Sequence, residues 1–291
     1  MKTSESLVPR VGNISFLNCA PIRWGLGDSG ALSDVDLVSA PPEQLATELL
    51  SGNLDISPIS LARYLQHADD LCLLPGLAIG SDGPVRSCHI VSRGPLEGLG
   101  GRVVALSEAS RSTALLARML LEDAVGVRPR YRTLGQDVDA MLSTAQAAVV
   151  IGDDALRLGA DVPSGLTVHD TGAMWRSWTN LPMVYAVWAV RREFAQARPD
   201  LVDEVQEALT DAVGRARSHP MEVAIAAARE SRESRNGAVD VPVLLDYYQA
   251  LDYSLGERQM AAIHEFAARA FARGEALTPV PARIPIHEGQ T

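Results

Sequence analysis

The feature that most constrains the fold is a regular alternation of short apolar segments with amphipathic ones over the first two-fifths of the chain. Strands are predicted at residues 11–16, 35–38, 54–56, 71–79 and 85–92. Helices are predicted at residues 41–51 and 60–67, the first with Pro42 in its opening turn and Gly52 after its end. Strict alternation of strand and helix predicts an α/β class, with a parallel sheet and helical crossovers.

A second series of the same kind follows a turn-rich run at residues 93–101 (RGPLEGLGG). Strands are predicted at 102–106, 131–134 and 147–151, and helices at 111–122 and 138–143. A strongly apolar strand at 184–190 is expected to carry the chain back to the first series. From Pro199 the periodicity becomes helical, with further helices expected at 221–232, 241–251 and 257–273.

Two βα series in a chain of 291 residues predict two lobes, because a single core usually serves about 100–200 residues. We expect residues 8–92 in lobe 1, 93–185 in lobe 2, 186–276 back in lobe 1 with C-terminal helices, and 277–291 as a Pro-rich tail. The two crossings, near Ser92 and Tyr185, would leave a ligand cleft between the lobes. In such folds ligands bind where strands end and helices begin. The layout is that of a two-lobed solute-binding protein.

Charge and composition narrow the partners. The net charge of −10 argues against nucleic acid and anionic membranes as partners, since both attract basic surfaces. Neither a secretory apolar core nor a 20-residue apolar span is evident, which predicts a cytoplasmic protein. Three cysteines without a Cys/His cluster predict no metal site. The oligomeric state is not encoded in any pattern that we recognise.

Two segments at predicted strand ends carry groups suited to an anionic ligand. Asn18 follows the first strand, where its amide would bind a ligand or cap a helix. Ser110, Ser112 and Thr113 bring hydroxyls to a helix N-terminus, and Arg111 adds a guanidinium. Backbone N–H groups, the helix dipole and a guanidinium together suit a carboxylate or phosphate. Plain capping, with Arg111 in solvent, is the alternative interpretation.

Two more segments offer acid–base groups. Gly152 at the end of a buried strand permits close backbone approach, and Asp153 or Asp154 would cap the next helix. An aspartate there is also a candidate general base. Ser87 and His89 fall on one face of a predicted strand, but a single half-buried histidine is more often structural than catalytic.

The region 175–188 (WRSWTNLPMVYAVW) is the densest aromatic cluster of the chain. It would either wall a pocket for a flat ring or pack in the core, and core packing is favoured for Trp188. No GxGxxG, GxxxxGK[ST] or HExxH motif and no Ser–His–Asp order is present, so nucleotide-binding, zincin and hydrolase functions lack support.

At these segments the chain resembles the MqnA family, the chorismate dehydratases of the futalosine route to menaquinone. The resemblance rests on six segments in order between Val11 and Ala189: VGNISFLNCAPIRWGL, LLSGNLDISPISLARYL, PVRSCHIVS, SRSTALLARMLL, VVIGDDALRL and WTNLPMVYAVWA. Two positions depart from the family pattern, Met183 where an aromatic residue is commoner and His89 where an aliphatic one is expected.

The resemblance implies a type II periplasmic-binding-protein fold used as a lyase. It implies conversion of chorismate, a dicarboxylate, to 3-[(1-carboxyvinyl)oxy]benzoate and water, without metal or organic cofactor. It places Asn18, Ser87 and Asp153 at pocket positions, and we expect these three residues to have catalytic roles. The substrate-binding positions that follow are Ser57, Ser110, Arg111, Ser112, Thr113 and Gly152.

Two alternatives stay open. One is a 1,4-dihydroxy-6-naphthoate synthase (MqnD-like) enzyme, although that family has a Ser-Pro-Cys-Pro-Asn-Asp type motif where this chain has FLNCAP. The other is a non-catalytic cytoplasmic module that binds a small anion. The general base is also open between Asp153 and the enolpyruvyl carboxylate of the substrate, and the absence of an evident His or Glu favours the substrate.

Overall fold

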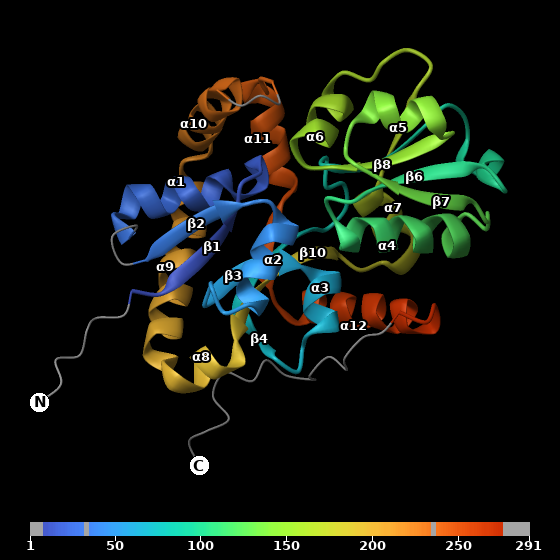
Figure 1. The fold of residues 1–291 in the computed structure, drawn as a ribbon. Coiled ribbons are helices and arrows are strands. Elements are labelled where there is room, and N and C mark those ends of the chain that lie inside the picture. Colours follow the sequence, from blue (N-terminus) through green and yellow to red (C-terminus); the bar gives the residue numbers. More distant parts are fainter. Residues whose placement is uncertain (1–7, 32–34, 234–236, 276–291) are drawn as a thin grey trace, which may run out of the picture.

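The computed structural model describes residues 8–31, 35–233 and 237–275, so the expected Pro-rich tail (277–291) lies outside the described residues. Two lobes, each built on its own sheet, lie side by side (Figure 1). The sheet of the first lobe has the order β11-β4-β10-β3-β1-β2 and that of the second β7-β6-β8-β5-β9. The chain therefore has a two-lobed α/β fold with helices added at its C-terminal end.

The first lobe contains strands β1 (Arg10–Ile14), β2 (Asp36–Ala40), β3 (Ile56–Ser60), β4 (Leu71–Ser81), β10 (Met183–Arg191) and β11 (Asp252–Leu255). Its helices up to the first crossing are the 3-10 turn η1 (Leu17–Cys19), α1 (Ala20–Ser29), α2 (Pro42–Leu50) and α3 (Leu61–Gln66). After β10 follow α8 (Arg192–Ala197), α9 (Pro199–Ser218), α10 (Pro220–Glu233), α11 (Val241–Ala250) and α12 (Glu257–Ala272).

The second lobe contains strands β5 (Cys88–Ser92), β6 (Val103–Ser107), β7 (Arg130–Leu134), β8 (Ala147–Ile151) and β9 (Thr167–Asp170). Its helices are the 3-10 turn η3 (Leu96–Leu99), α4 (Arg111–Met119) with the π turn η4 (Leu120–Ala124), α5 (Val138–Thr144), α6 (Gly152–Ala160) and α7 (Thr171–Thr179). The elements β9, α7 and β11 were absent from the sequence-based prediction.

The prediction of parallel sheets was wrong for part of each sheet. β1 runs parallel to β2 and β3, and β6 parallel to β7 and β8, as alternation predicts. β10 is antiparallel to its neighbours β3 and β4, and β5 is antiparallel to β8 and β9. The reason is that strands next to a lobe crossing are not joined to their neighbours by a local βαβ crossover, so the handedness rule does not fix their direction.

The crossings lie earlier in the chain than expected. β4 ends at Ser81 in the first sheet and β5 begins at Cys88 in the second, so the first crossing is residues 82–87 rather than near Ser92. The return lies between α7 and β10, at residues 180–182, so Tyr185 is already in the first sheet. Residues 88–92 therefore belong to lobe 2, and 183–185 to lobe 1.

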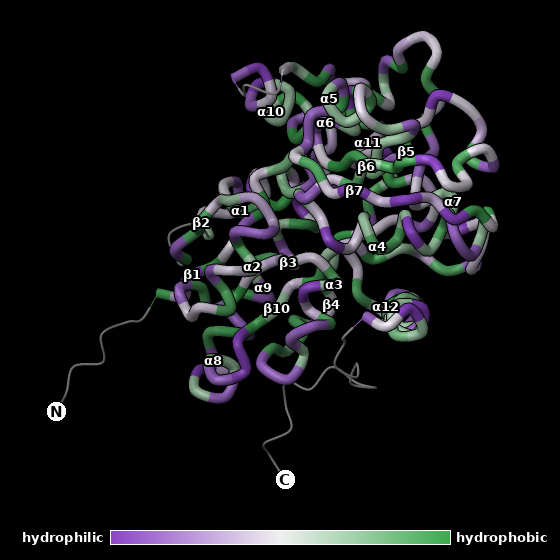
Figure 2. Tube along the Cα trace, turned by 45° about the vertical axis from the view of Figure 1, so that its right-hand side comes forward, coloured by the Kyte–Doolittle hydropathy of each residue, from purple (hydrophilic) through white to green (hydrophobic). Residues whose placement is uncertain are grey.

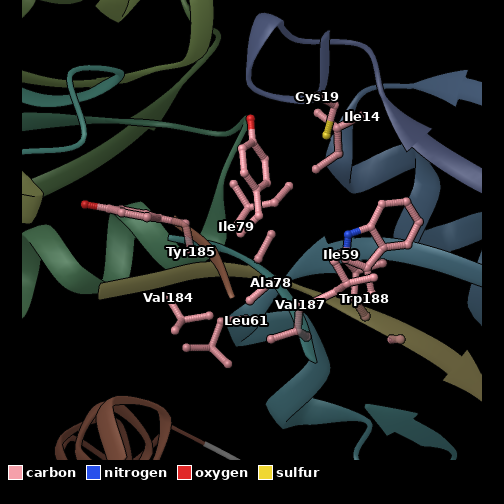
Figure 3. Close-up of a cluster of buried hydrophobic side chains, with 14 of the residues drawn as sticks. Ile14, Cys19, Ile59, Leu61, Ala78, Ile79, Val184, Tyr185, Val187 and Trp188 are labelled. Carbon is pink, nitrogen blue, oxygen red and sulfur yellow. The ribbon is translucent and has the colours of Figure 1, made fainter. Parts of the chain in front are cut away.

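The core of the first lobe is centred on β10, which the sequence correctly marked as strongly apolar. Val184, Val187 and Trp188 lie among Ile59 and other apolar side chains of the neighbouring strands (Figure 3). The hydropathy colouring shows these apolar strands inside, with more polar segments on the outer helices (Figure 2). Both Trp175 and Trp188 are fully buried, which settles the aromatic cluster in favour of core packing at these two positions.

The first C-terminal helix packs back on the first lobe. The periodicity of this segment predicts an apolar stripe of Leu201, Val205, Ala208, Leu209 and Ala212; α9 buries four of these side chains, and Ala208 is partly buried. α9 approaches α1 closely because α1 has Gly25 at the contact, where a Cβ atom would lie 2.1 Å from the backbone oxygen of Ala212. None of the described helices is long and apolar enough to cross a membrane.

Candidate functional site

Four predicted site residues come together where the two lobes meet. Asn18 lies in η1 of the first lobe, while Ser87 in the first crossing and Gly152 and Asp153 at the start of α6 face it from the second lobe. Direct hydrogen bonds join the two sides at this interface. We expected the ligand cleft at this place, so these contacts define the candidate site.

Asn18 does not cap a helix, since the cap position of α1 is Cys19 and no side chain caps that end. Its backbone carbonyl accepts a hydrogen bond of 2.6 Å from the Tyr253 hydroxyl. Its side-chain oxygen Oδ1 is buried and has no hydrogen-bond partner within the described part of the chain. Buried polar atoms without partners are uncommon because they lose hydration without compensation. The unpaired amide oxygen can accept a hydrogen bond from a ligand.

Asp153 links the lobes directly. Its Oδ1 accepts a hydrogen bond of 3.0 Å from the backbone N–H of Leu17, so a residue of α6 caps η1 of the other lobe. Burial raises the pKa of Asp153 above its ordinary value, although the Leu17 N–H and nearby arginines oppose the shift. The capping role predicted for the Asp153–Asp154 pair in its own helix was wrong, because Ile151 occupies the cap position and no side chain caps it.

Position 152 favours glycine because of its backbone conformation and because the Phe16 ring lies close to it. Its φ of +66° lies in the left-handed region, and a Cβ atom there would sit 3.2 Å from the ring of Phe16. The residue thus lets the first-lobe turn at Phe16 approach α6. This bears out the expected close approach, with a protein ring as the approaching group.

We predict that Gly152→Ala lowers both stability and turnover. A left-handed non-glycine residue costs about 1–2 kcal/mol, and the Phe16 ring must also move. The matched control is Gly126→Ala, because Gly126 has a φ of +84° with open space around it. Both variants should lower the thermal midpoint, but only Gly152→Ala should lower kcat/KM. Equal turnover in the two variants would contradict the placement of Gly152 in the site.

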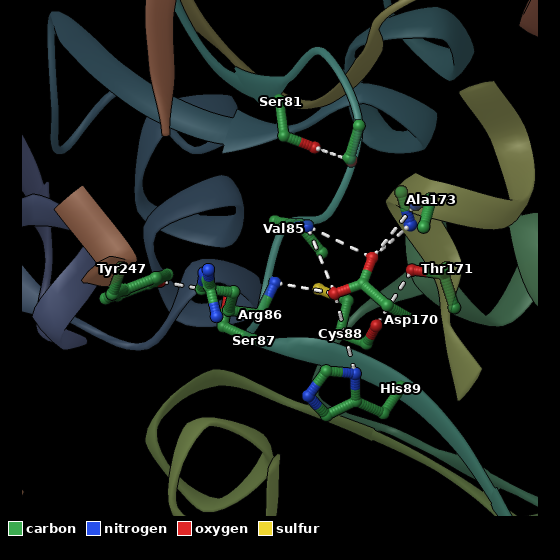
Figure 4. Close-up of polar contacts among 12 residues, drawn as sticks. Ser81, Val85, Arg86, Ser87, Cys88, His89, Asp170, Thr171, Ala173 and Tyr247 are labelled. Carbon is green, nitrogen blue, oxygen red and sulfur yellow. Dashed lines mark hydrogen bonds and ion pairs between the residues drawn. The ribbon is translucent and has the colours of Figure 1, made fainter. Parts of the chain in front are cut away.

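Ser87 and His89 were predicted on one face of a strand, but they have different surroundings in the structure (Figure 4). Ser87 is buried at the lobe interface, where its Oγ accepts a hydrogen bond of 2.9 Å from the Tyr247 hydroxyl. His89 is buried inside lobe 2, with Nε2 2.8 Å from the position that a Cβ atom on Gly159 would take. Burial lowers the pKa of His89, although the Asp170 carboxylate at 3.8 Å opposes the shift. His89 therefore lies away from the lobe interface, but both of its ring nitrogens are buried without hydrogen-bond partners among the described residues, so it is not the satisfied structural histidine that was expected.

The hydroxyls at the start of α4 already have protein partners. Ser110 caps the helix by accepting from the Thr113 N–H at 3.2 Å, as the capping alternative predicts. Ser112 accepts a 2.8 Å hydrogen bond from the Ala62 N–H of lobe 1, and the Thr113 hydroxyl donates to the Cys88 sulfur at 3.7 Å. In this conformation all three hydroxyls form hydrogen bonds with protein groups. They do not form the predicted anion site here.

Arg111 and Ser57 are also placed differently from the predicted substrate contacts. The Arg111 guanidinium is half-exposed and lies 3.6 Å from Glu43 of α2, across the lobe interface. Ser57 is fully buried inside lobe 1, where its hydroxyl donates to the Pro58 carbonyl at 3.3 Å and fills the space above Gly12. A ligand between the lobes does not reach Ser57 in this arrangement, so we correct that assignment.

Sequence reasoning missed the tyrosines of α11 and β11. Tyr247 and Tyr253 are buried and contact Ser87 and Asn18, and the Tyr248 hydroxyl is buried without a hydrogen-bond partner among the described residues. Burial raises the pKa of all three tyrosines, so their hydroxyls stay neutral and can donate. Three of the six tyrosines of the chain within seven residues were the available signal.

The site is therefore rich in neutral hydrogen-bonding groups. Among the described residues, no group of three or more His, Cys, Asp or Glu side chains is placed to hold a metal ion. An amide, several hydroxyls and one carboxylate with a raised pKa are positioned to bind and polarise a small polar molecule between two lobes.

Comparisons with known proteins agree with this architecture. The family described as menaquinone biosynthesis matches residues 9–272. A chorismate dehydratase from Thermus thermophilus is 33% identical over 87% of this chain and 91% of its own length. A 1,4-dihydroxy-6-naphthoate synthase from the same organism is 28% identical over 80% of this chain and 82% of its own length.

The fold is that of periplasmic binding proteins. The alkanesulfonate-binding protein SsuA from Xanthomonas axonopodis pv. citri superposes with a TM-score of 0.69 at 16% identity, over 93% of this chain and 94% of SsuA. With the family match over nearly all of the described residues, these similarities show that the chain belongs to the menaquinone biosynthesis family.

Proposed function

We propose that the protein is a chorismate dehydratase, a hydro-lyase that converts chorismate to 3-[(1-carboxyvinyl)oxy]benzoate and water. The observation that carries the proposal is the buried, unpaired Oδ1 of Asn18 at a lobe interface lined with neutral donors. The identity of 33% with a chorismate dehydratase adds independent support. As its location we propose the cytoplasm, which suits three buried free cysteines because reducing compartments keep thiols unpaired.

The reaction needs the groups that the interface supplies. Chorismate loses the proton on C3 and the hydroxyl on C4, and the ring becomes aromatic. A carbanion at C3 is conjugated with the ring carboxylate, so an enolate-like state must be stabilised while hydroxide leaves as water. Preorganised neutral donors stabilise such charge without a large reorganisation cost in a site shielded from water. Holding the substrate in one orientation also disfavours its competing pericyclic rearrangement.

The residues divide between the reacting ring and the carboxylates. We assign Asn18 and Ser87 to the reacting ring or the departing hydroxyl, because both lie at the interface beside neutral tyrosine hydroxyls. We assign Arg111, at the start of α4, to one substrate carboxylate. This assignment requires the guanidinium to exchange Glu43 for the substrate, since Glu43 is its partner in the present conformation.

The proton acceptor is either Asp153 or the enolpyruvyl carboxylate of the substrate. The raised pKa of Asp153, caused by burial, suits a general base, since a base works best with a pKa near the operating pH. Its Oδ1, however, is engaged by the Leu17 N–H. This engagement favours the substrate carboxylate as the base and a positioning role for Asp153.

We predict that Asn18→Ala lowers kcat/KM at least tenfold, about 1.4 kcal/mol, because an amide contact to the transition state is lost. The thermal midpoint should stay the same or rise, since the substitution removes a buried oxygen that lacks a partner. Asn53→Ala is the matched control, because Asn53 is exposed and bonds Glu48 of α2. Equal turnover in the two variants would remove Asn18 from the mechanism.

Incubating the purified protein with chorismate tests the function, with ultraviolet and mass detection of a product that has lost one water. Product formation supports the dehydratase. Tight binding without product supports instead a binding module, the class to which the alkanesulfonate-binding relative belongs. Turnover of cyclic de-hypoxanthinyl futalosine, without turnover of chorismate, supports a naphthoate synthase like the 28% identical relative.

A further inference from the structure

The segment formed by α11 and β11 contacts both residues that the proposed function assigns to the reacting ring. Tyr247 of α11 donates to the Ser87 side chain, and Tyr253 of β11 donates to the Asn18 backbone. In Figure 1, α11 stands between the first lobe and α6 of the second. These contacts join residues 160 and 235 positions apart in sequence, so they exist only after the C-terminal segment has folded onto both lobes.

The contact of Tyr247 determines what the Ser87 hydroxyl can do. The Tyr247 hydroxyl donates to Ser87 Oγ at 2.9 Å, and burial holds the pKa of Tyr247 well above its ordinary value, so this proton stays on the tyrosine. The Ser87 proton then goes to another acceptor, which is the Cys88 sulfur in this conformation and would be a substrate oxygen when substrate is bound. A hydroxyl that accepts one hydrogen bond becomes a stronger donor in the next, because the chain is mutually polarised. The geometry thus prepares Ser87 to donate toward a departing oxygen (Figure 4).

A second contact lies beside the first. Asp246 forms an ion pair of 3.2 Å with Arg86, so two successive residues of α11 contact two successive residues of the first crossing, although both charged side chains are exposed and solvent weakens this pair. Arg86 has a φ of +63°, which is a rare conformation for a residue other than glycine. The turn that carries Ser87 is therefore held by α11 from one side and by the carboxylate of Asp170, which accepts the N–H groups of Val85 and Arg86, from the other.

Tyr253 acts on Asn18 in a different way. Its hydroxyl lies 2.6 Å from the Asn18 carbonyl, a short hydrogen bond that fixes the backbone of η1. The Asn18 side chain has no partner of its own at Oδ1, so its direction depends on this backbone. Tyr253 is itself buried, which restricts its ring to one position.

We propose that Tyr247 and Tyr253 are positioning residues for the dehydration, Tyr247 by polarising and orienting Ser87 and Tyr253 by fixing the turn that carries Asn18. The proposal rests on the proposed function and deepens it. The C-terminal segment would then be part of the active site. Without it, the two βα lobes would leave Ser87 and Asn18 without the hydrogen bonds from Tyr247 and Tyr253.

A double-mutant cycle in the full-length protein tests the proposal. Tyr247→Phe should lower kcat about five- to tenfold and leave KM within about twofold, because one hydrogen bond that acts through Ser87 is lost. In a Ser87→Ala background the same change should cost less than about twofold, since its partner is gone. Tyr253→Phe should keep its full effect in the Ser87→Ala background and lose it in the Asn18→Ala background.

Tyr64→Phe is the matched control, because Tyr64 is a buried tyrosine of α3 whose neighbours are Cys72 and Arg192 and not Ser87 or Asn18. It should leave kcat unchanged. Losses from Tyr247→Phe and Ser87→Ala that simply add, or a fall in kcat that follows a fall in the folded fraction, would overturn the proposal. The cycle is measured with chorismate, or with cyclic de-hypoxanthinyl futalosine if the wild-type protein turns over only that compound. Additive losses in an active wild type overturn this inference alone, whereas no turnover of chorismate overturns the proposed function.

Discussion

Replacing Asp55 with alanine is expected to lower the free energy of unfolding by about 2 kcal/mol, because two arginines lose the buried carboxylate that they share, while solvent reaches part of both guanidinium groups and reduces the loss. Asp55 is 2% exposed, and its Oδ1 lies 2.8 Å from Nη2 of both Arg10 and Arg191. Its Oδ2 also accepts from the backbone N–H of Arg10 at 3.0 Å. The carboxylate joins β1 to the end of β10, two strands on opposite sides of β3.

The effect should depend on pH. Burial by itself would raise the pKa of Asp55, but the hydrogen bonds from Arg10 and Arg191 outweigh it and lower the pKa below its ordinary value. A group whose pKa is lower in the folded state contributes stability above its unfolded pKa of about 3.9 and loses that contribution as the pH falls through the folded value. The gap between wild type and Asp55→Ala should therefore be full near pH 7 and should shrink below about pH 4.

Chemical denaturation across this pH range measures the gap. The matched control is Asp200→Ala, because Asp200 also pairs with an arginine, Arg198 at 2.7 Å, but at the exposed start of α9. That variant should leave the unfolding midpoint nearly unchanged, since solvent screens exposed ion pairs. If Asp55→Ala proves as mild as the control, the network does not stabilise the first lobe.

Two substitutions of Asp153 are expected to differ sharply in turnover. Asp153→Ala should lower kcat/KM about ten- to hundredfold, because a hydrogen bond to a charged acceptor that joins the lobes is lost. Asp153→Asn should stay within about threefold of wild type, since the amide oxygen can still accept from the Leu17 N–H. The comparison separates the two roles, because asparagine keeps the contact but cannot take a proton.

Steady-state kinetics on chorismate measures both variants, beside the control Asp154→Asn. The Asp154 carboxylate bonds within lobe 2, where it accepts a hydrogen bond of 3.0 Å from the Gln136 amide and pairs with Arg157. Asp153→Asn as inactive as Asp153→Ala, with the control active, would identify Asp153 as the general base. Full activity in both Asp153 variants would show that Asp153 is not the general base and that its hydrogen bond to Leu17 is not needed for turnover.

Local patterns predicted most of the elements but not how some strands pair. The predicted helix at 41–51 is α2 (Pro42–Leu50), and the buried strand at 147–151 is β8, because helix stops and apolar runs act over a few residues. The short elements β9 and β11 were missed because four residues carry too little periodicity. The strand direction of β10 was not predicted, since it depends on where the chain crosses between lobes.

The candidate site, too, could be predicted only in part from local sequence. Asn18, Gly152 and Asp153 follow from the rule that ligands bind where strands end, and Ser87 from strand alternation and the family resemblance; the structure brings all four to the lobe interface. Ser57 was predicted to bind substrate, but packing against Gly12 encloses it inside lobe 1. The hydroxyls of α4 match the pattern of an anion site. Local sequence does not reveal that the Ala62 N–H of the other lobe donates a hydrogen bond to the Ser112 hydroxyl.

Apolar periodicity and turn residues act between near neighbours in the chain, so the α/β class, the two lobes and the loops that carry polar groups could be predicted from local patterns. The contacts of Tyr247 with Ser87, of Tyr253 with Asn18 and of Asp153 with η1 of the other lobe are visible only in the folded protein. These pairs are separated by more than a hundred residues, and burial sets both their hydrogen bonding and their pKa values, so they depend on how whole elements pack.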